Sequence, residues 1–140
     1  MKYKLVILIS FLLPKFSFGC DCKIQESTVA EHYKAYDLVV KGKIVKIQAH
    51  KRFNVLTIDV EEDFKGVNKN KTIKVSTPNV GPSCGLGVLV GETWLLYAYK
   101  SEKKLFTNSC TQCKNLSMFS GNNQENVKSE LDYLRSVKIY

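Results

Sequence analysis

Apolar and polar residues alternate most regularly between residues 56 and 64 of the chain. Leu56, Ile58, Val60 and Phe64 are separated by threonine or acidic residues, which is the two-residue period of a strand with one buried face. We therefore predict a strand here, with these four side chains on the core face. The Lys65-Gly66 pair is expected to turn the chain out of the strand.

Two more strands are predicted on either side of this one. Residues 38–47 are rich in Val and Ile around Gly42, a position that favours a bend or bulge where a barrel turns a corner. Residues 72–76 place Ile73 and Val75 on one face of a shorter strand.

The second half of the chain begins with a loop at residues 78–85, which is rich in Pro and Gly and contains Cys84. Residues 94–99 then form a nearly continuous apolar run, which predicts a strand buried on both faces. Residues 105–107 are expected to pair with that run across residues 100–104. The sequence therefore predicts five strands.

Helices are predicted at both ends of the strand region. Thr28 and Glu31 have the spacing of a capping box, and a short helix is expected to run to about Tyr36. Residues 122–125 repeat the capping pattern. Apolar residues then recur at helical spacing, namely Val127, Leu131, Leu134 and Val137. The expected fold is mainly β, a five-stranded OB-like barrel flanked by a short N-terminal helix and a C-terminal helix.

The first nineteen residues have the layout of a secretory signal peptide. Two lysines precede an apolar run, and small residues follow it near Gly19. Cleavage after Gly19 would leave residues 20–140 as one domain, with Cys20 as its first residue. Three lysines leave with the leader, so the formal charge falls from +8 to +5. The remaining lysines are interleaved with acidic residues, and we interpret them as a solvated surface.

The compartment follows from the leader and from the cysteines. All five cysteines lie after the leader, and an exported chain meets an environment in which cysteines pair. Cys20 and Cys22 are too close to bridge each other without strain, so distant partners are expected. An odd count leaves one thiol over, which is Cys113 if Cys20 is bridged, or Cys20 itself if that residue carries a lipid. We therefore predict a secreted protein, with lipid anchoring of Cys20 at the cell envelope as the alternative.

Other chemistry-bearing residues have plainer interpretations. Cys110 and Cys113 form a C-x-x-C pair that a thiol oxidoreductase or a zinc site could use, but the pair lies at the end of a predicted hairpin rather than at a helix N-terminus. His32 and His50 belong to no catalytic motif. The acidic run 61–63 is interpreted as a solvated strand edge.

The aromatic residues in the last long strand raise a further alternative. Trp94, Tyr97 and Tyr99 could stack on nucleic acid bases, as aromatic residues of OB barrels do. The signal peptide argues against nucleic acid as a partner, so we predict that these aromatic residues pack in the core.

Several segments together resemble the netrin-like domain of the tissue inhibitors of metalloproteinases. The strongest element is the Cys-x-Cys at the predicted mature N-terminus, with single cysteines at compatible distances, and the resemblance extends over residues 20–137. The matching segments are Cys20-Asp21-Cys22, Tyr36-Asp37-Leu38-Val39-Val40-Lys41-Gly42, Asp63-Phe64-Lys65-Gly66, Ser83-Cys84-Gly85, and Trp94-Leu95-Leu96-Tyr97-Ala98 followed by Cys110.

The resemblance implies both a disulfide pattern and a mechanism. It pairs Cys20 with Cys84 and Cys22 with Cys110, and it leaves Cys113 as the extra thiol. The Cys20 α-amine and carbonyl oxygen would bind the catalytic zinc of a target protease and displace its water. By the same resemblance, the inhibitory edge comprises Cys20, Asp21, Cys22, Lys23, Ile24, Pro82 and Ser83.

One residue of this edge departs from the animal pattern. The family places a small hydroxyl residue where this chain has Asp21. A carboxylate that enters an apolar pocket costs a few kcal/mol in desolvation unless it is paired. The target is therefore expected to differ from the typical matrix proteases.

The first functional hypothesis is a secreted metalloendopeptidase inhibitor that is not itself an enzyme. It needs no cofactor, and its partner is a zinc metalloprotease or another extracellular protein; nucleic acid is not expected. The second hypothesis is a non-catalytic extracellular or envelope interaction module, which contacts a membrane only if Cys20 is lipidated. A secreted thiol oxidoreductase that uses Cys110 and Cys113 is the third.

Overall fold

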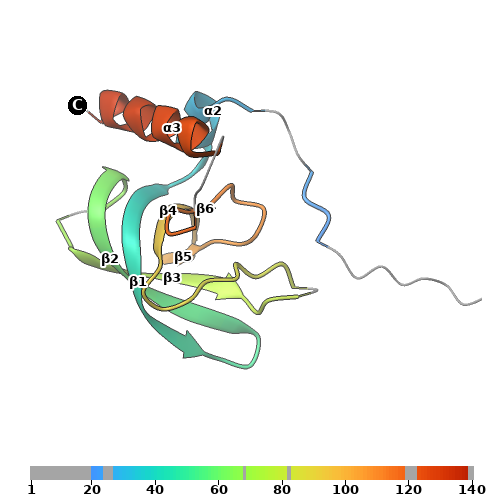
Figure 1. Ribbon diagram of the computed structural model, residues 1–140. Helices are drawn as coiled ribbons and strands as arrows, with labels where there is room; N and C mark the ends of the chain where they lie inside the picture. The colour runs from blue at the N-terminus through green and yellow to red at the C-terminus, as the bar shows by residue number, and fades with distance from the viewer. Residues whose placement is uncertain (1–19, 24–26, 68, 82, 119–122, 139–140) are drawn as a thin grey trace, which may run out of the picture.

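The computed structural model describes residues 20–23, 27–67, 69–81, 83–118 and 123–138 (Figure 1). The elements are the helix α2 (Val29–Ala35), the strands β1 (Leu38–Ala49), β2 (Phe53–Lys65), β3 (Thr72–Pro78), β4 (Thr93–Ser101), β5 (Lys104–Phe106) and β6 (Lys114–Asn115), and the helix α3 (Asn123–Val137). Strands dominate, as the sequence predicts.

Strands β1 to β5 close into a barrel. The neighbours run in the order β1, β2, β3, β5, β4, and β4 pairs back onto β1. All these pairs are antiparallel except β3 and β5, which meet in parallel at Ser76 and Phe106. The short strand β6 adds to the outer edge of β4. The predicted five-stranded barrel with an N-terminal and a C-terminal helix is confirmed.

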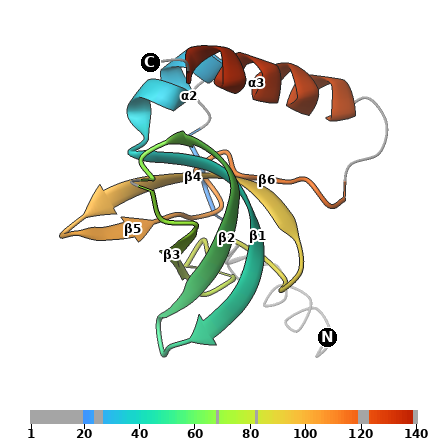
Figure 2. The ribbon, with the colours of Figure 1, turned by 90° about the vertical axis from the view of Figure 1, so that its left-hand side faces the viewer.

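The barrel has one apolar cluster inside and a second one outside, beneath the helices. Side chains of β4 alternate between them: Leu96 lies in the inner cluster, whereas Leu95 and Tyr97 lie in the outer one. In Figure 2 both helices lie across one end of the barrel, over this outer cluster. The prediction that β4 is buried on both faces is confirmed. Tyr99 is an exception, because it is 40% exposed.

Phe64 does not share the face of the residues with which it alternates in sequence. Leu56 and Ile58 lie in the inner cluster, but Phe64 lies in the outer one. In the pairing of β1 with β2, Glu61 and Phe64 have no partner residue on β1. The extra residue at Glu61 is a bulge, and it shifts the in-and-out alternation by one position before the chain reaches Phe64. The prediction for Phe64 was correct in burial and wrong in face.

Helix α2 begins and ends on specific side-chain contacts. Thr28 and Glu31 form the predicted capping box, in which Glu31 accepts from the Thr28 amide at 2.7 Å. At the other end, Lys65 Nζ donates to the carbonyl oxygens of Tyr33 and Tyr36 at 2.8 and 2.5 Å. A seven-residue helix is marginal alone, so these contacts with β2 fix its position.

Helix α3 packs its apolar face on the outer cluster. Val127 and Leu134 are buried, and Leu131 is half-buried. The predicted helix is confirmed, and only the cap at Asn122 lies outside the described residues. Within the described part of the chain, no helix is both long and apolar enough to cross a membrane.

Candidate functional site

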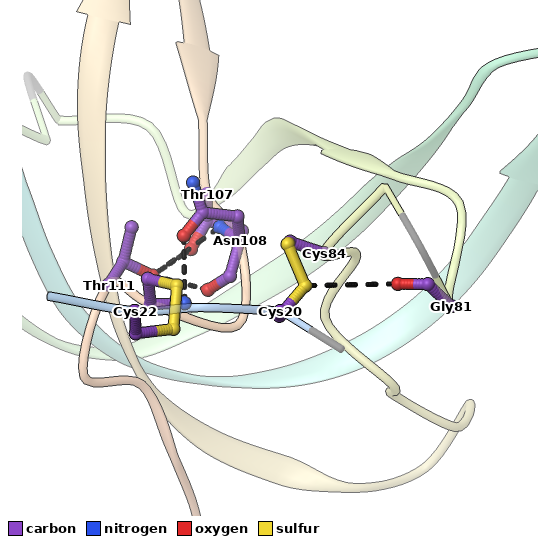
Figure 3. The surroundings of a disulfide bond; sticks show 8 residues. Cys20, Cys22, Gly81, Cys84, Thr107, Asn108 and Thr111 are labelled. Atoms are coloured by element: carbon purple, nitrogen blue, oxygen red, sulfur yellow. Dashed lines mark hydrogen bonds between the residues drawn. A yellow bond between two sulfur atoms is a disulfide. The ribbon is translucent and has the colours of Figure 1, made fainter. Parts of the chain in front are cut away.

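Residues 20–23 form an exposed segment that two disulfides hold against the barrel (Figure 3). Cys20 is bridged to Cys84 and Cys22 to Cys110, each with its Cα atoms 5.4 Å apart. These are the pairs that the resemblance implies. The two bridges lie two residues apart, so Asp21 is held between them with its side chain in solvent.

The loop that carries Cys84 is held by its own backbone. The Cys84 amide donates to the Gly81 carbonyl oxygen at 3.0 Å, and the Gly85 amide donates to the Asn79 carbonyl oxygen at 3.2 Å. Cys84 itself has a positive φ of 61°. The Cys20 sulfur lies 3.8 Å from the Gly81 carbonyl oxygen, a close contact across the same turn.

The loop that carries Cys110 is fixed by hydroxyl and amide side chains. Asn108 Oδ1 accepts from the Cys110 amide at 2.8 Å, and the Asn108 carbonyl oxygen accepts from Thr111 Oγ1 at 2.8 Å. Thr107 Oγ1 lies 2.6 Å from Thr111 Oγ1 and donates to the Tyr97 carbonyl oxygen at 2.9 Å. These contacts attach the loop to the buried strand β4.

The two loops are also joined to each other. The Ser109 amide donates to the Cys84 carbonyl oxygen at 2.9 Å. Both anchors of residues 20–22 therefore belong to one hydrogen-bonded unit. We call Cys20, Asp21, Cys22, Lys23 and Ser83 the cysteine-anchored edge.

The structure brings these five predicted site residues to one side of the barrel. Cys20, Asp21, Lys23 and Ser83 are exposed, and Cys22 is half-buried. Ile24 and Pro82, which were predicted as part of the same edge, lie outside the described residues. The exposed residues of this edge are available to a partner.

Cys113 is the free cysteine, and it lies against both apolar clusters. Its sulfur accepts from the Tyr97 amide at 3.2 Å and lies 3.2 Å from the hydroxyl oxygens of Thr107 and Thr111. Burial raises the pKa of the Cys113 thiol, so the thiol stays protonated at neutral pH. Cys110 is already bridged to Cys22, and the C-x-x-C pair is therefore not a redox-active dithiol in this structure.

Sequence reasoning missed one contact close to the edge. His32 belongs to no catalytic motif in the sequence, but in the structure it is half-buried and its Nε2 hydrogen-bonds Ser27 Oγ. The two side chains line a cavity of about 180 Å³ beside Lys23 and Cys110.

Within the described part of the chain, no three His, Cys, Asp or Glu residues are grouped so that they could hold a metal ion. No protein-family model matches this chain, and no curated protein matches its sequence closely.

Proposed function

We propose that this protein inhibits a zinc-dependent metalloprotease by presenting the cysteine-anchored edge to the active-site cleft. The observation that carries the proposal is the double anchoring of an exposed segment, with bridges at Cys20 and Cys22 to two loops that are themselves hydrogen-bonded. A segment that is already rigid loses little conformational entropy on binding. This favours insertion into a cleft as an extra strand.

The chemistry that follows requires cleavage after Gly19. A free α-amine at Cys20 has an ordinary pKa of about 8 and loses its proton on binding a metal. The amine and the carbonyl oxygen of Cys20 then occupy the zinc position that the hydrolytic water needs. The resemblance to the metalloproteinase inhibitors supports this assignment, as does the bridge at Cys20, because a sulfur in a disulfide cannot carry a lipid thioether.

Asp21 restricts the choice of target. Its exposed carboxylate lies between the two bridges, where it would enter the pocket next to the zinc. Burial of an unpaired carboxylate is costly, so the proposed target has a cationic or hydrogen-bonding pocket. An Asp21→Thr variant should therefore lose affinity for the native target and gain it for proteases with apolar pockets.

The test begins with the exported protein from its own host. Intact mass and non-reducing peptide mapping should give a free Cys20 amine and the two bridges. The protein is then assayed against a panel of zinc metalloproteases, with serine proteases as a negative control. Selective acetylation of the α-amine should weaken inhibition by more than about 100-fold, or about 2.7 kcal/mol.

Three outcomes would overturn the proposal. The first is a lipid-sized mass increment at Cys20, which would instead favour the tethered interaction module. The second is inhibition that survives acetylation of the amine. The third is a correctly bridged protein that inhibits no metalloprotease in the panel.

A further inference from the structure

A second surface of the barrel carries features that the cysteine-anchored edge does not use. A hollow of about 420 Å³ is bounded by the β1–β2 loop, the strands β2 and β3, and the β4–β5 turn. In Figure 2, β5 lies beside β3 below the two helices. In OB barrels the wall formed by the second and third strands and the loops 1–2 and 4–5 binds chain-like ligands.

The pairing of the strands aligns four outward-facing side chains in a row across this wall. Leu56 and Val75 are paired and point into the core, so the next pair along the strands, Val55 and Ser76, points outward. Ser76 is paired with Phe106, and Phe106 with Tyr99. These four outward side chains therefore lie side by side across β2, β3, β5 and β4.

Two aromatic pairs give the row flat exposed faces. Tyr99 stacks on Phe106 with ring centroids 6.0 Å apart, and Phe53 stacks on His50 at 4.7 Å. Tyr99 is 40% exposed and Phe53 is 39% exposed. Exposed rings that are held in place by a second ring are suited to stack on the flat face of a sugar or a base.

Three lysines line the same hollow, and they come from distant parts of the sequence. Lys74 lies two residues before Ser76 on β3, Lys104 lies two residues before Phe106 on β5, and Lys103 lies in the turn. All three are exposed. Among the described residues, those that line the hollow include no carboxylate. The sequence suggested scattered lysines, and it is the fold that gathers these three.

The charge of these lysines is not compensated. Lys41, Lys114 and Arg135 each form an ion pair, whereas none of the ion pairs between described residues involves a lysine of the hollow. Three like charges beside one another repel, and binding of an anion relieves that repulsion. The hollow is therefore complementary to a negatively charged ligand.

The turn that presents Lys103 has an uncommon backbone. Glu102 and Lys103 both have positive φ, 47° and 69°, the conformation of a two-residue hairpin turn in which Asn and Gly are strongly preferred. A non-glycine residue in this region is strained. The strained turn places the Lys103 side chain at the rim of the hollow, which is consistent with a binding role for it.

We propose that this hollow, bounded by the β1–β2 loop, β2, β3 and the β4–β5 turn, binds an anionic polysaccharide. One sugar ring would stack on Phe53, which lines the hollow, and another on Tyr99, which lies beside Phe106 in the adjoining row. Sulfate or carboxylate groups would pair with the lysines. The two disulfides belong to an oxidising, extracellular environment, where charged polysaccharides are common and single-stranded nucleic acid is not. The hollow shape and the row of rings suit a chain better than a flat membrane.

The test uses four probes of matched length: a heparin fragment, oligogalacturonate, neutral dextran and oligo(dT). We expect the protein to bind at least one of the two anionic sugars, and the tighter one identifies sulfate or carboxylate as the recognised group. Binding should weaken as salt is raised. Failure to bind either anionic sugar, or tighter binding of oligo(dT), would overturn the proposal.

Two matched double variants distinguish binding at the hollow from general attraction of an anion to a basic protein. A Lys74→Gln, Lys104→Gln double variant should lose at least tenfold in affinity. A Lys43→Gln, Lys46→Gln double variant removes the same charge from exposed, unpaired lysines of β1, and it should bind almost as the unmodified protein does. Equal losses in both would overturn the proposal. Thermal unfolding of each variant checks that the fold is intact.

The aromatic contribution has its own variants. Phe53→Ala should weaken binding of the sugar without changing its salt dependence, and Phe53→Tyr, which keeps the ring, should restore the affinity. A Phe53→Ala protein that unfolds at the normal temperature and binds with unchanged affinity would contradict the stacking part of the proposal.

Discussion

The phenol of Tyr97 donates a hydrogen bond to Glu130 Oε1 at 2.6 Å, joining the outer face of β4 to helix α3. Glu130 is only 4% exposed, and its other oxygen pairs with Lys114 of β6. Burial and this carboxylate raise the pKa of Tyr97 well above its usual range. A buried carboxylate thus connects helix α3 to the two paired strands β4 and β6.

Removal of the Tyr97 hydroxyl should destabilise the protein by about 1–3 kcal/mol, because Glu130 would keep its burial and lose a partner. Tyr97→Phe tests this by urea unfolding, with Tyr99→Phe as the exposed control. The double variant Tyr97→Phe, Glu130→Met should cost less than the sum of its single changes. Strict additivity would show that the two residues are not coupled.

Stability should depend on pH through Glu62. Hydrogen bonds from Arg135, 2.8 Å long to each carboxylate oxygen, lower the pKa of Glu62 from 4.5 to about 2. Because the folded pKa lies below the ordinary value, this contribution is complete above pH 4.5 and is lost as the pH falls toward 2.

Glu62→Gln should therefore lower the free energy of unfolding by about 1 kcal/mol at pH 7, and the difference from the unmodified protein should shrink between pH 5 and pH 2. Urea unfolding across this range measures it. Glu102→Gln, at a residue that forms no ion pair among those described, is the control. A difference that is constant with pH would contradict the assignment.

Alanine substitution should have very different effects on stability at two glycines in the loop after β3. A Cβ atom at Gly85 would overlap the Pro78 carbonyl oxygen, whereas nothing lies within 4 Å of the same position at Gly87. Gly85→Ala should destabilise the protein by about 2–3 kcal/mol, and it should displace the neighbouring Cys84. Gly87→Ala should change stability by less than about 0.5 kcal/mol. Thermal unfolding of the two variants compares them directly, and equal effects would show that the loop adapts.

The Cys113 thiol should react slowly in the folded protein. It is buried, its pKa is raised by that burial, and the other four cysteines are bridged. A thiol-specific reagent should therefore modify one cysteine per chain in denaturant and almost none in the native state. Rapid modification of the native protein, or three reactive thiols, would contradict the pairing.

The parts of the fold that could be predicted from sequence are those fixed by local pattern. The capping box at Thr28, the doubly buried strand at 94–98 and the apolar face of α3 follow from residues close together in the chain. The face of Phe64 could not be predicted, because the bulge that shifts it depends on the pairing with β1. Burial of Glu130 likewise depends on partners from β4 and β6.

The two candidate sites also differ in whether they could be predicted from the sequence. The cysteine-anchored edge could be proposed from the spacing of Cys20 and Cys22 and from the resemblance. The hollow could not, because Lys74 and Lys104 become neighbours only when β3 and β5 meet. Tyr99 belongs to the same apolar run as Leu96, but it is 40% exposed and lies outside the outer cluster.

The disulfide pattern also determines what a proteolytic cut can do to this molecule. Every peptide bond between Cys22 and Cys110 lies inside at least one loop closed by a bridge. A nick in the exposed segment 50–52, or in the turn at residues 102–103, therefore gives two fragments that stay covalently joined. A protein whose proposed partner is a protease can be cleaved once in its barrel and remain one molecule.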